Sequence, residues 1–240
     1  MNLAGALFCS SIGRKFIMAA TGVVLIFFII GHLVGNLQIF QPPDHINGYA
    51  HFLRQLGPLL WVVRSVLLAS VILHIWAGTA LAHENLQARG NPPYGVKTWI
   101  RASYASRYVR WTGYIVLAFV LYHLAHFSFG WAQPATFKAN LPLYTMAGDY
   151  HVLGFSVVKA GTQVPDVYSM MILGFQNPFV SIFYIIAVGL LSFHLLHGAD
   201  SLFQTFGWRN ERWAGPLRKI VAVCCLAYFL GNLIIPGAVL

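Results

Sequence analysis

Long apolar stretches separated by short polar segments run through the whole chain. A helix needs roughly 20 mostly apolar residues to cross the hydrocarbon of a membrane, because each residue adds about 1.5 Å. Five stretches reach that length, at about residues 16–40, 59–83, 108–131, 178–206 and 216–235. Pro178 and Pro216 stand at the expected starts of the last two, where a missing N–H costs least. The pattern predicts an all-α membrane protein with five transmembrane helices in a single domain, residues 1–240.

The composition excludes most other protein classes. Hydrophobic residues make up 58% of the chain and charged residues 9%, against roughly a quarter charged in ordinary soluble domains. These values exclude a soluble enzyme and a disordered chain. The net charge of +9 comes from short basic clusters between apolar stretches. Such clusters are typical of loops that face an anionic lipid leaflet, so no nucleic-acid partner is expected.

The distribution of lysine and arginine predicts the orientation in the membrane. With the N-terminus in the cytoplasm, the inner segments carry Arg14, Lys15, Arg89, Lys97, Arg101, Arg107, Arg110, Arg209, Arg212, Arg218 and Lys219. The outer segments then carry Arg54, Arg64, Lys138 and Lys159. Because cytoplasmic loops are enriched in these residues, the N-terminus is expected inside and the C-terminus outside. The outer segment 132–177 is long enough that it is expected to pack on another element or to have a function.

Histidines inside the apolar stretches are the candidate functional residues, because ionisable side chains are costly in a membrane. The embedded ones are His32, His74, His123, His126, His194 and His197. Each of the first four stretches carries at least one of them, and the fifth carries none. An interhelical hydrogen bond would explain any one of these residues alone, but it does not explain the distribution of the set.

The depths of these histidines form two layers. Counted from the inner end, His32 and His123 lie roughly 23–26 Å along their helices, whereas His74, His194 and His197 lie roughly 12–18 Å along theirs. Two bis-histidine sites at two depths are what two b-type haems need, since each iron takes one imidazole from either side. Six-coordinate iron leaves no position for O₂, which indicates electron transfer.

Two glycines support a flat cofactor between the helices. Gly22 precedes His32 by ten residues, and Gly113 precedes His123 by ten. Ten residues correspond to about 15 Å of helix, so both glycines are expected at the depth of the other layer. A macrocycle there needs missing side chains, although ordinary small-residue packing between membrane helices would use glycine as well.

Short motifs along nearly the whole chain resemble one family, the dihaem cytochrome b membrane-anchor subunit of succinate dehydrogenase and fumarate reductase, in its single-chain, five-helix form. The matching motifs are Ser11–Lys15, Gly31–Asn36, Tyr49–Phe52, Leu73–His74, Glu84–Asn85, Tyr122–Leu124, Asp166–Ser169, Gly174–Pro178 and His197–Gly198. The resemblance implies that the first four helices form a haem-binding bundle in a bacterial cytoplasmic membrane. Some dihaem members have a glutamate beside the ligand of the fourth span, and the stretch 192–196 lacks one, which puts a coupled transmembrane proton path in doubt.

The resemblance also implies ligands, partners and a reaction. The haem-iron ligands would be His32 and His123 for the outer haem b, and His74 and His197 for the inner one. The partners would be a flavoprotein subunit and an iron–sulfur subunit on the cytoplasmic face. Electrons would pass from succinate through those subunits and the two haems to a quinone, such as menaquinone, or in the reverse direction to fumarate. The succinate site would lie on a partner, because this chain has no flavin motif and no cluster cysteines.

A quinone site is expected at the outer end, because a second haem there has little purpose if electrons leave at the inner face. Quinone reduction needs protons from groups that reach water. The candidates are Asp44, His51 and His126, with His51 favoured because aromatic residues flank it. The rival is an inner site near Ser11 and Arg14.

Two other functions fit the same sequence features. The first is a dihaem cytochrome b that serves another membrane dehydrogenase, of the hydrogenase or formate dehydrogenase type. The second is a haem-free transporter or anchor whose histidines bridge helices. A transported metal ion would favour carboxylates or thiolates among the histidines, and the acidic residues near the spans, Glu84 and Asp200, stand at their inner ends.

Overall fold

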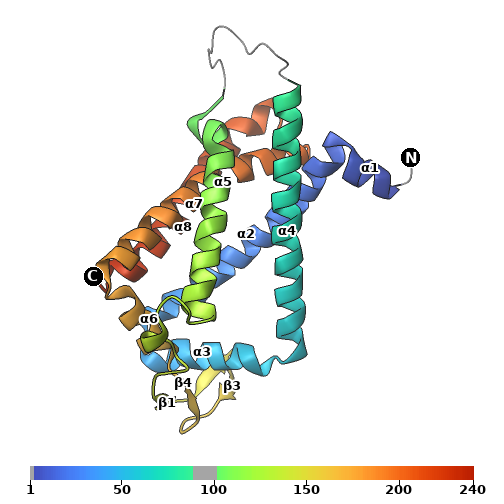
Figure 1. Ribbon diagram of the computed structural model, residues 1–240. Helices are drawn as coiled ribbons and strands as arrows, with labels where there is room; N and C mark the ends of the chain where they lie inside the picture. Colours follow the sequence, from blue (N-terminus) through green and yellow to red (C-terminus); the bar gives the residue numbers. More distant parts are fainter. Residues whose placement is uncertain (1–2, 89–101) are drawn as a thin grey trace. The chain divides into compact units, whose positions relative to one another are not determined.

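The computed structural model describes residues 3–88 and 102–240, so Arg89, Lys97 and Arg101 lie outside the described residues. Its long helices are α2 (Ser11–Asn36), α4 (Pro58–Gln87), α5 (Tyr104–His123), α7 (Pro178–Thr205) and α8 (Glu211–Gly237). All five are long and apolar enough to cross a membrane, two of them together with the short turns that extend them (Figure 1). The predicted all-α, multi-pass membrane fold is confirmed.

Shorter elements connect or extend these helices. They are α1 (Leu3–Cys9), η1 (Leu37–Phe40), α3 (Pro43–Gln55), the π-helical turn η2 (Leu124–Ser128), η3 (Pro134–Thr136) and α6 (Val167–Phe175). Four short strands are β1 (Leu143–Thr145), β2 (Tyr150–Val152), β3 (Phe155–Val158) and β4 (Gln163–Pro165). They pair antiparallel as β1 with β4 and β2 with β3. Segment 132–177 is therefore folded, and its strands β2, β3 and β4 contact α3, which confirms the prediction that it packs on another element.

The fifth long helix begins five residues earlier than the proline pattern predicted. The Asn210 side chain accepts a hydrogen bond from the Trp213 N–H at 3.0 Å, which satisfies one of the free donors at the start of α8. Glu211 follows in the first turn, where a negative charge is favoured by the helix dipole. Pro216 consequently lies inside the helix rather than at its start.

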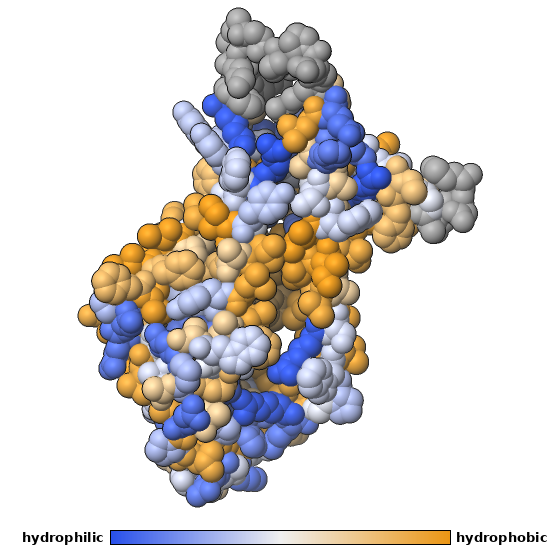
Figure 2. All heavy atoms as spheres, viewed as in Figure 1, coloured by the Kyte–Doolittle hydropathy of each residue, from blue (hydrophilic) through white to orange (hydrophobic). Residues whose placement is uncertain are grey.

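Large apolar side chains are exposed along the five helices. Phe27 is 73% exposed and Val223 is 67% exposed. Figure 2 shows hydrophobic residues over the middle of the long helices, and hydrophilic ones over the upper ends of these helices and among the residues of α3 and the strands. Lipid would cover this apolar surface, since a soluble protein rarely exposes so much of it.

Contacts between residues divide the chain into two compact units. The first unit contains Met1–Phe28, Ser65–Tyr114 and Leu190–Ala227. The second contains Ile29–Arg64, Ile115–Gly189 and Tyr228–Leu240. Each is described below by itself.

Ion pairs at the helix ends hold the first unit together. Arg14 of α2 pairs with Glu84 of α4, and the Ser11 hydroxyl donates to the same carboxylate at 2.9 Å. Asp200 of α7 pairs with Arg209 at 3.1 Å and with Arg218 at 3.4 Å. Arg14 and Ser11, the rival quinone contacts, thus already share a partner within the chain.

A buried amide anchors α3 in the second unit. Asn47 has no exposed surface, and its Oδ1 accepts from the N–H groups of Val167 and Tyr168 at 2.8 and 2.9 Å. Its amide nitrogen donates to Asp166 at 3.2 Å, and Asp166 also caps α6 through the Ser169 N–H. Both ends of the Asn47 amide are satisfied, so α3 is fixed to the start of α6.

Candidate functional site

The second unit brings His32 and His123 together, as the sequence predicted. His32 lies on α2 and His123 is the last residue of α5. Their ring centroids are 5.7 Å apart and their planes are at 89°. We call these two residues the outer pair, after the predicted orientation.

The first unit brings His74 of α4 together with His194 of α7, and we call these residues the inner pair. Their ring centroids are 6.5 Å apart, with planes at 66°. His197, which the family resemblance implied as the inner ligand, instead shares a hydrogen bond of 3.2 Å with Ser201 on its own helix. The geometry therefore favours His194 over His197 as the partner of His74.

The spacing of the rings fits one iron between each pair. An imidazole nitrogen binds a first-row metal at about 2 Å and its ring centre lies about 1 Å further, so two imidazoles on opposite sides of one iron have centres about 6 Å apart. The observed separations, 5.7 Å and 6.5 Å, lie on either side of this value. Within the described residues no group of three or more His, Cys, Asp or Glu gathers for a metal ion. A haem iron with two axial ligands takes two protein side chains, because the porphyrin ring supplies the other four nitrogens.

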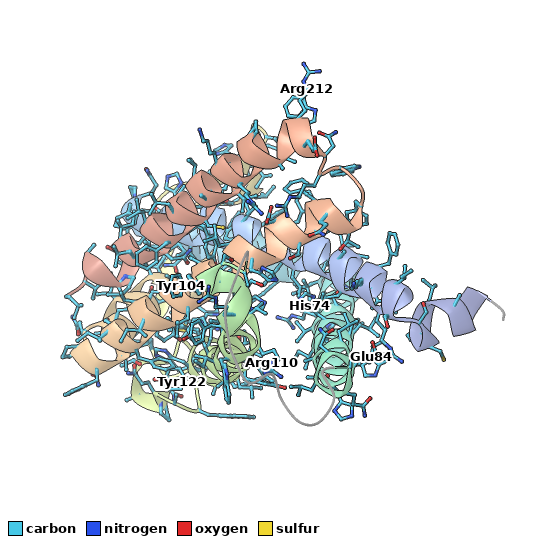
Figure 3. All side chains as sticks on the ribbon, turned by 90° about the horizontal axis from the view of Figure 1, so that it is seen from above. His74, Glu84, Tyr104, Arg110, Tyr122 and Arg212 are labelled. Carbon is cyan, nitrogen blue, oxygen red and sulfur yellow. The ribbon has the colours of Figure 1, made fainter. Side chains whose placement is uncertain are left out.

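Hydrogen bonds fix the orientation of both inner rings. Nδ1 of His74 lies 3.1 Å from the Met18 carbonyl and 3.1 Å from the Thr21 hydroxyl, and Figure 3 shows the ring pointing from α4 toward α2. A carbonyl only accepts, so Nδ1 carries the proton and Nε2 keeps its lone pair for a metal. Nδ1 of His194 lies 3.3 Å from the Thr112 hydroxyl of α5. That hydroxyl donates its own proton to the Val109 carbonyl at 3.0 Å, so Nδ1 of His194 carries the proton as well.

The two spaced glycines lie against these rings. A Cβ added to Gly22 would meet His74 Cε1 at 3.5 Å, and one added to Gly113 would meet His194 Cε1 at 3.4 Å. The expected relation between glycines and the other histidine layer is thus present within the first unit. Each glycine directly follows the threonine that contacts the same imidazole. The sequence analysis missed these threonines, although Thr-Gly occurs at the same distance before His32 and before His123.

His123 of the outer pair contacts a tyrosine that the sequence analysis also missed. The Tyr184 hydroxyl of α7 lies 3.4 Å from His123 Nδ1 and 3.0 Å from His126 Nδ1. His126 is 2% exposed, and its Nε2 lies 3.1 Å from Gln133 Oε1. Both ring nitrogens of His126 are therefore engaged inside the protein.

The other two quinone candidates differ in how they are engaged. Asp44 accepts from the Ala147 N–H at 2.8 Å and lines a cavity of about 120 Å³ with His45, Asp149, Tyr150 and His151. His51 is half-buried within α3, and within residues 3–88 and 102–240 no hydrogen bond to its ring is found. Of the three, His51 has ring nitrogens available for a ligand.

Lys138 contacts the π-helical turn η2, which directly follows His123 of the outer pair. Lys138 donates to the Phe127 carbonyl at 3.1 Å. Burial, followed by the charges of Arg54 and Arg64, lowers the pKa of Lys138 to about 8. An anionic group placed near these three side chains would be stabilised by them.

Comparisons with models of protein families, with curated proteins and with solved structures find no match. The case for a cofactor therefore rests on the side chains themselves. It consists of two histidine pairs at the spacing of axial ligands, with Nδ1 of His74 bonded to the Met18 carbonyl and Nδ1 of His194 beside the Thr112 hydroxyl.

Proposed function

We propose that this chain is the membrane-anchor and electron-transfer subunit of a succinate:quinone oxidoreductase, holding two b haems. The observation that carries the proposal is the pair of bis-histidine arrangements, with ring centroids 5.7 and 6.5 Å apart. The order of motifs along the chain supports the choice of this enzyme over other membrane dehydrogenases. The flavoprotein and iron–sulfur subunits would bind on the cytoplasmic side, where the basic residues are predicted.

Haem b would supply an iron that accepts and releases one electron at a time. His32 and His123 would hold one haem, and His74 and His194 the other. Thr21 and Thr112, together with the Met18 carbonyl, would fix the inner imidazoles so that Nε2 faces the iron. Gly22 and Gly113 would leave room beside those rings. The apolar spans would exclude water from both sites.

The haem content of the purified chain tests this proposal. A pyridine-haemochrome assay should return two b haems per chain, and the reduced-minus-oxidised spectrum should contain two components. One haem would contradict the dihaem arrangement. No haem in well-folded protein would favour a haem-free transporter or anchor. If two haems are found, the soluble subunits that co-purify distinguish succinate dehydrogenase from a hydrogenase or formate dehydrogenase.

We further propose that quinone, such as menaquinone, binds near His51 at the outer end. His51→Leu should slow quinone reduction about a hundredfold or more, the range expected for loss of a proton donor, while both haems stay bound and reducible. His45→Leu is the matched control, because His45 lies on the same helix and is exposed. Normal turnover in His51→Leu, combined with loss of turnover in Arg14→Leu, would move the quinone site to the inner face.

A further inference from the structure

A chain of hydrogen bonds leads from the outer ligand His123 to the loop after α5. It runs from His123 Nδ1 to the Tyr184 hydroxyl at 3.4 Å and from there to His126 Nδ1 at 3.0 Å. It continues from His126 Nε2 to Gln133 Oε1 at 3.1 Å, where the Thr136 hydroxyl also donates at 3.2 Å. All of these residues belong to the second unit.

The amide oxygen at the end of the chain sets the direction of every proton in it. Gln133 Oε1 can only accept, so His126 Nε2 must carry a proton. His126 is 2% exposed and its partners are an uncharged phenol and an uncharged amide, so burial favours the neutral ring. Nδ1 of His126 is then an acceptor, and the Tyr184 hydroxyl donates to it. The Tyr184 oxygen, having used its only proton, accepts from His123 Nδ1–H.

Close packing holds these hydrogen-bonded side chains in place. The His126 ring stacks on Phe127 with centroids 3.9 Å apart. A Cβ added to Gly174 would come within 3.2 Å of His126 Nε2. The Tyr184 ring lies edge-on to Phe175 at 5.0 Å. The π-helical turn η2 contains His126, and such turns are frequent at functional sites.

We propose that Gln133, acting through His126 and Tyr184, places the proton of His123 on Nδ1 and so leaves Nε2 as the metal-binding nitrogen. Gln133, His126 and Tyr184 are thus positioning residues of the outer site. The consequence for haem rests on the proposed function; the position of the proton does not. His74 of the inner pair needs no such chain, because a backbone carbonyl already accepts from it.

Redox titration of the full-length chain measures the consequence for haem. In Tyr184→Phe the acceptor for Nδ1–H is lost, so His123 becomes a weaker electron donor and reduced iron is favoured. At the potential where the unaltered outer haem is half reduced, we expect the ratio of reduced to oxidised haem to rise about tenfold, a shift of about 59 mV. Gln133→Leu should shift the same component in the same direction.

Tyr122→Phe is the matched control, because the Tyr122 ring packs 6.1 Å from Tyr184 without belonging to the chain. Unchanged potentials in Tyr184→Phe and Gln133→Leu, or an equal shift in Tyr122→Phe, would overturn the proposal. A second measurement does not depend on haem. The ¹⁵N spectrum of histidine-labelled, haem-free chain should show His123 protonated on Nδ1, and Tyr184→Phe should lose that preference. If the protein binds no haem but His123 still shows this tautomer, the proposed function would be refuted and the proposed role of Gln133, His126 and Tyr184 would be supported.

Discussion

Replacing His194 by alanine is expected to remove one of the two b-haem components from the reduced-minus-oxidised spectrum, whereas His197→Ala should retain both. The reason is geometric: the His194 ring lies 6.5 Å from His74, while His197 bonds Ser201 on its own helix. His74→Ala should lose the same component as His194→Ala. His32→Ala and His123→Ala should each lose the other one.

His197→Ala is the internal control for this set, since it removes an imidazole one turn away on the same helix. Loss of a haem in His197→Ala with retention in His194→Ala would return the assignment to the one that the family resemblance implied. Loss of the same component in His32→Ala and His74→Ala would show that the pairing itself is wrong.

Leucine in place of Gly22 or Gly113 is expected to lower the occupancy of the inner haem by about tenfold or more, since overpacking costs about 1–3 kcal/mol. The added Cβ alone would lie 3.5 Å from His74 or 3.4 Å from His194, and the rest of the leucine side chain would enter the space beside the ring. The outer component should remain. Haem quantification together with the difference spectrum measures both effects.

Gly198→Leu provides the matched control, because a Cβ added there meets nothing within 4 Å. It lies on α7, close in sequence to His194. If Gly198→Leu loses the inner haem as completely as Gly22→Leu does, the effect is a general one of bulk in the helices. Full occupancy in both Gly22→Leu and Gly113→Leu would show that no macrocycle lies against these positions.

The five spans could be predicted from the sequence because each apolar stretch is long and is bounded by proline, glycine or polar residues. It missed the start of α8 because a side-chain cap at Asn210 outweighed the preference of proline for a helix start. The predicted meeting of His32 with His123 is reproduced because His32 is the one embedded histidine of its stretch, and His126 lies about 4.5 Å further along its span than His123.

His194 and His197 could not be separated from the sequence. They lie three residues apart, which changes the direction of a side chain by about 60° and its depth by about 4.5 Å. Only the position of the neighbouring helices decides between such directions. Tyr184 was missed for a related reason: a tyrosine in an apolar span is ordinary, and its role depends on a hydroxyl contact with His123 across two helices.

The repeated Thr-Gly and histidine spacing of α2 and α5 has a consequence for how the protein is made. Each of these helices is followed by shorter elements, which include α3 after α2 and the four strands and α6 after α5, and then by a second long helix, α4 or α7, that supplies a single histidine to the inner pair. The order of elements and histidines is thus that of two tandem copies of one pattern, and each copy contributes one histidine to each pair. Neither copy alone contains a complete pair. During synthesis the outer pair is complete once His123 has been added, and the inner pair must wait for α7, so the outer site of the proposed dihaem arrangement is the first to have both of its histidines.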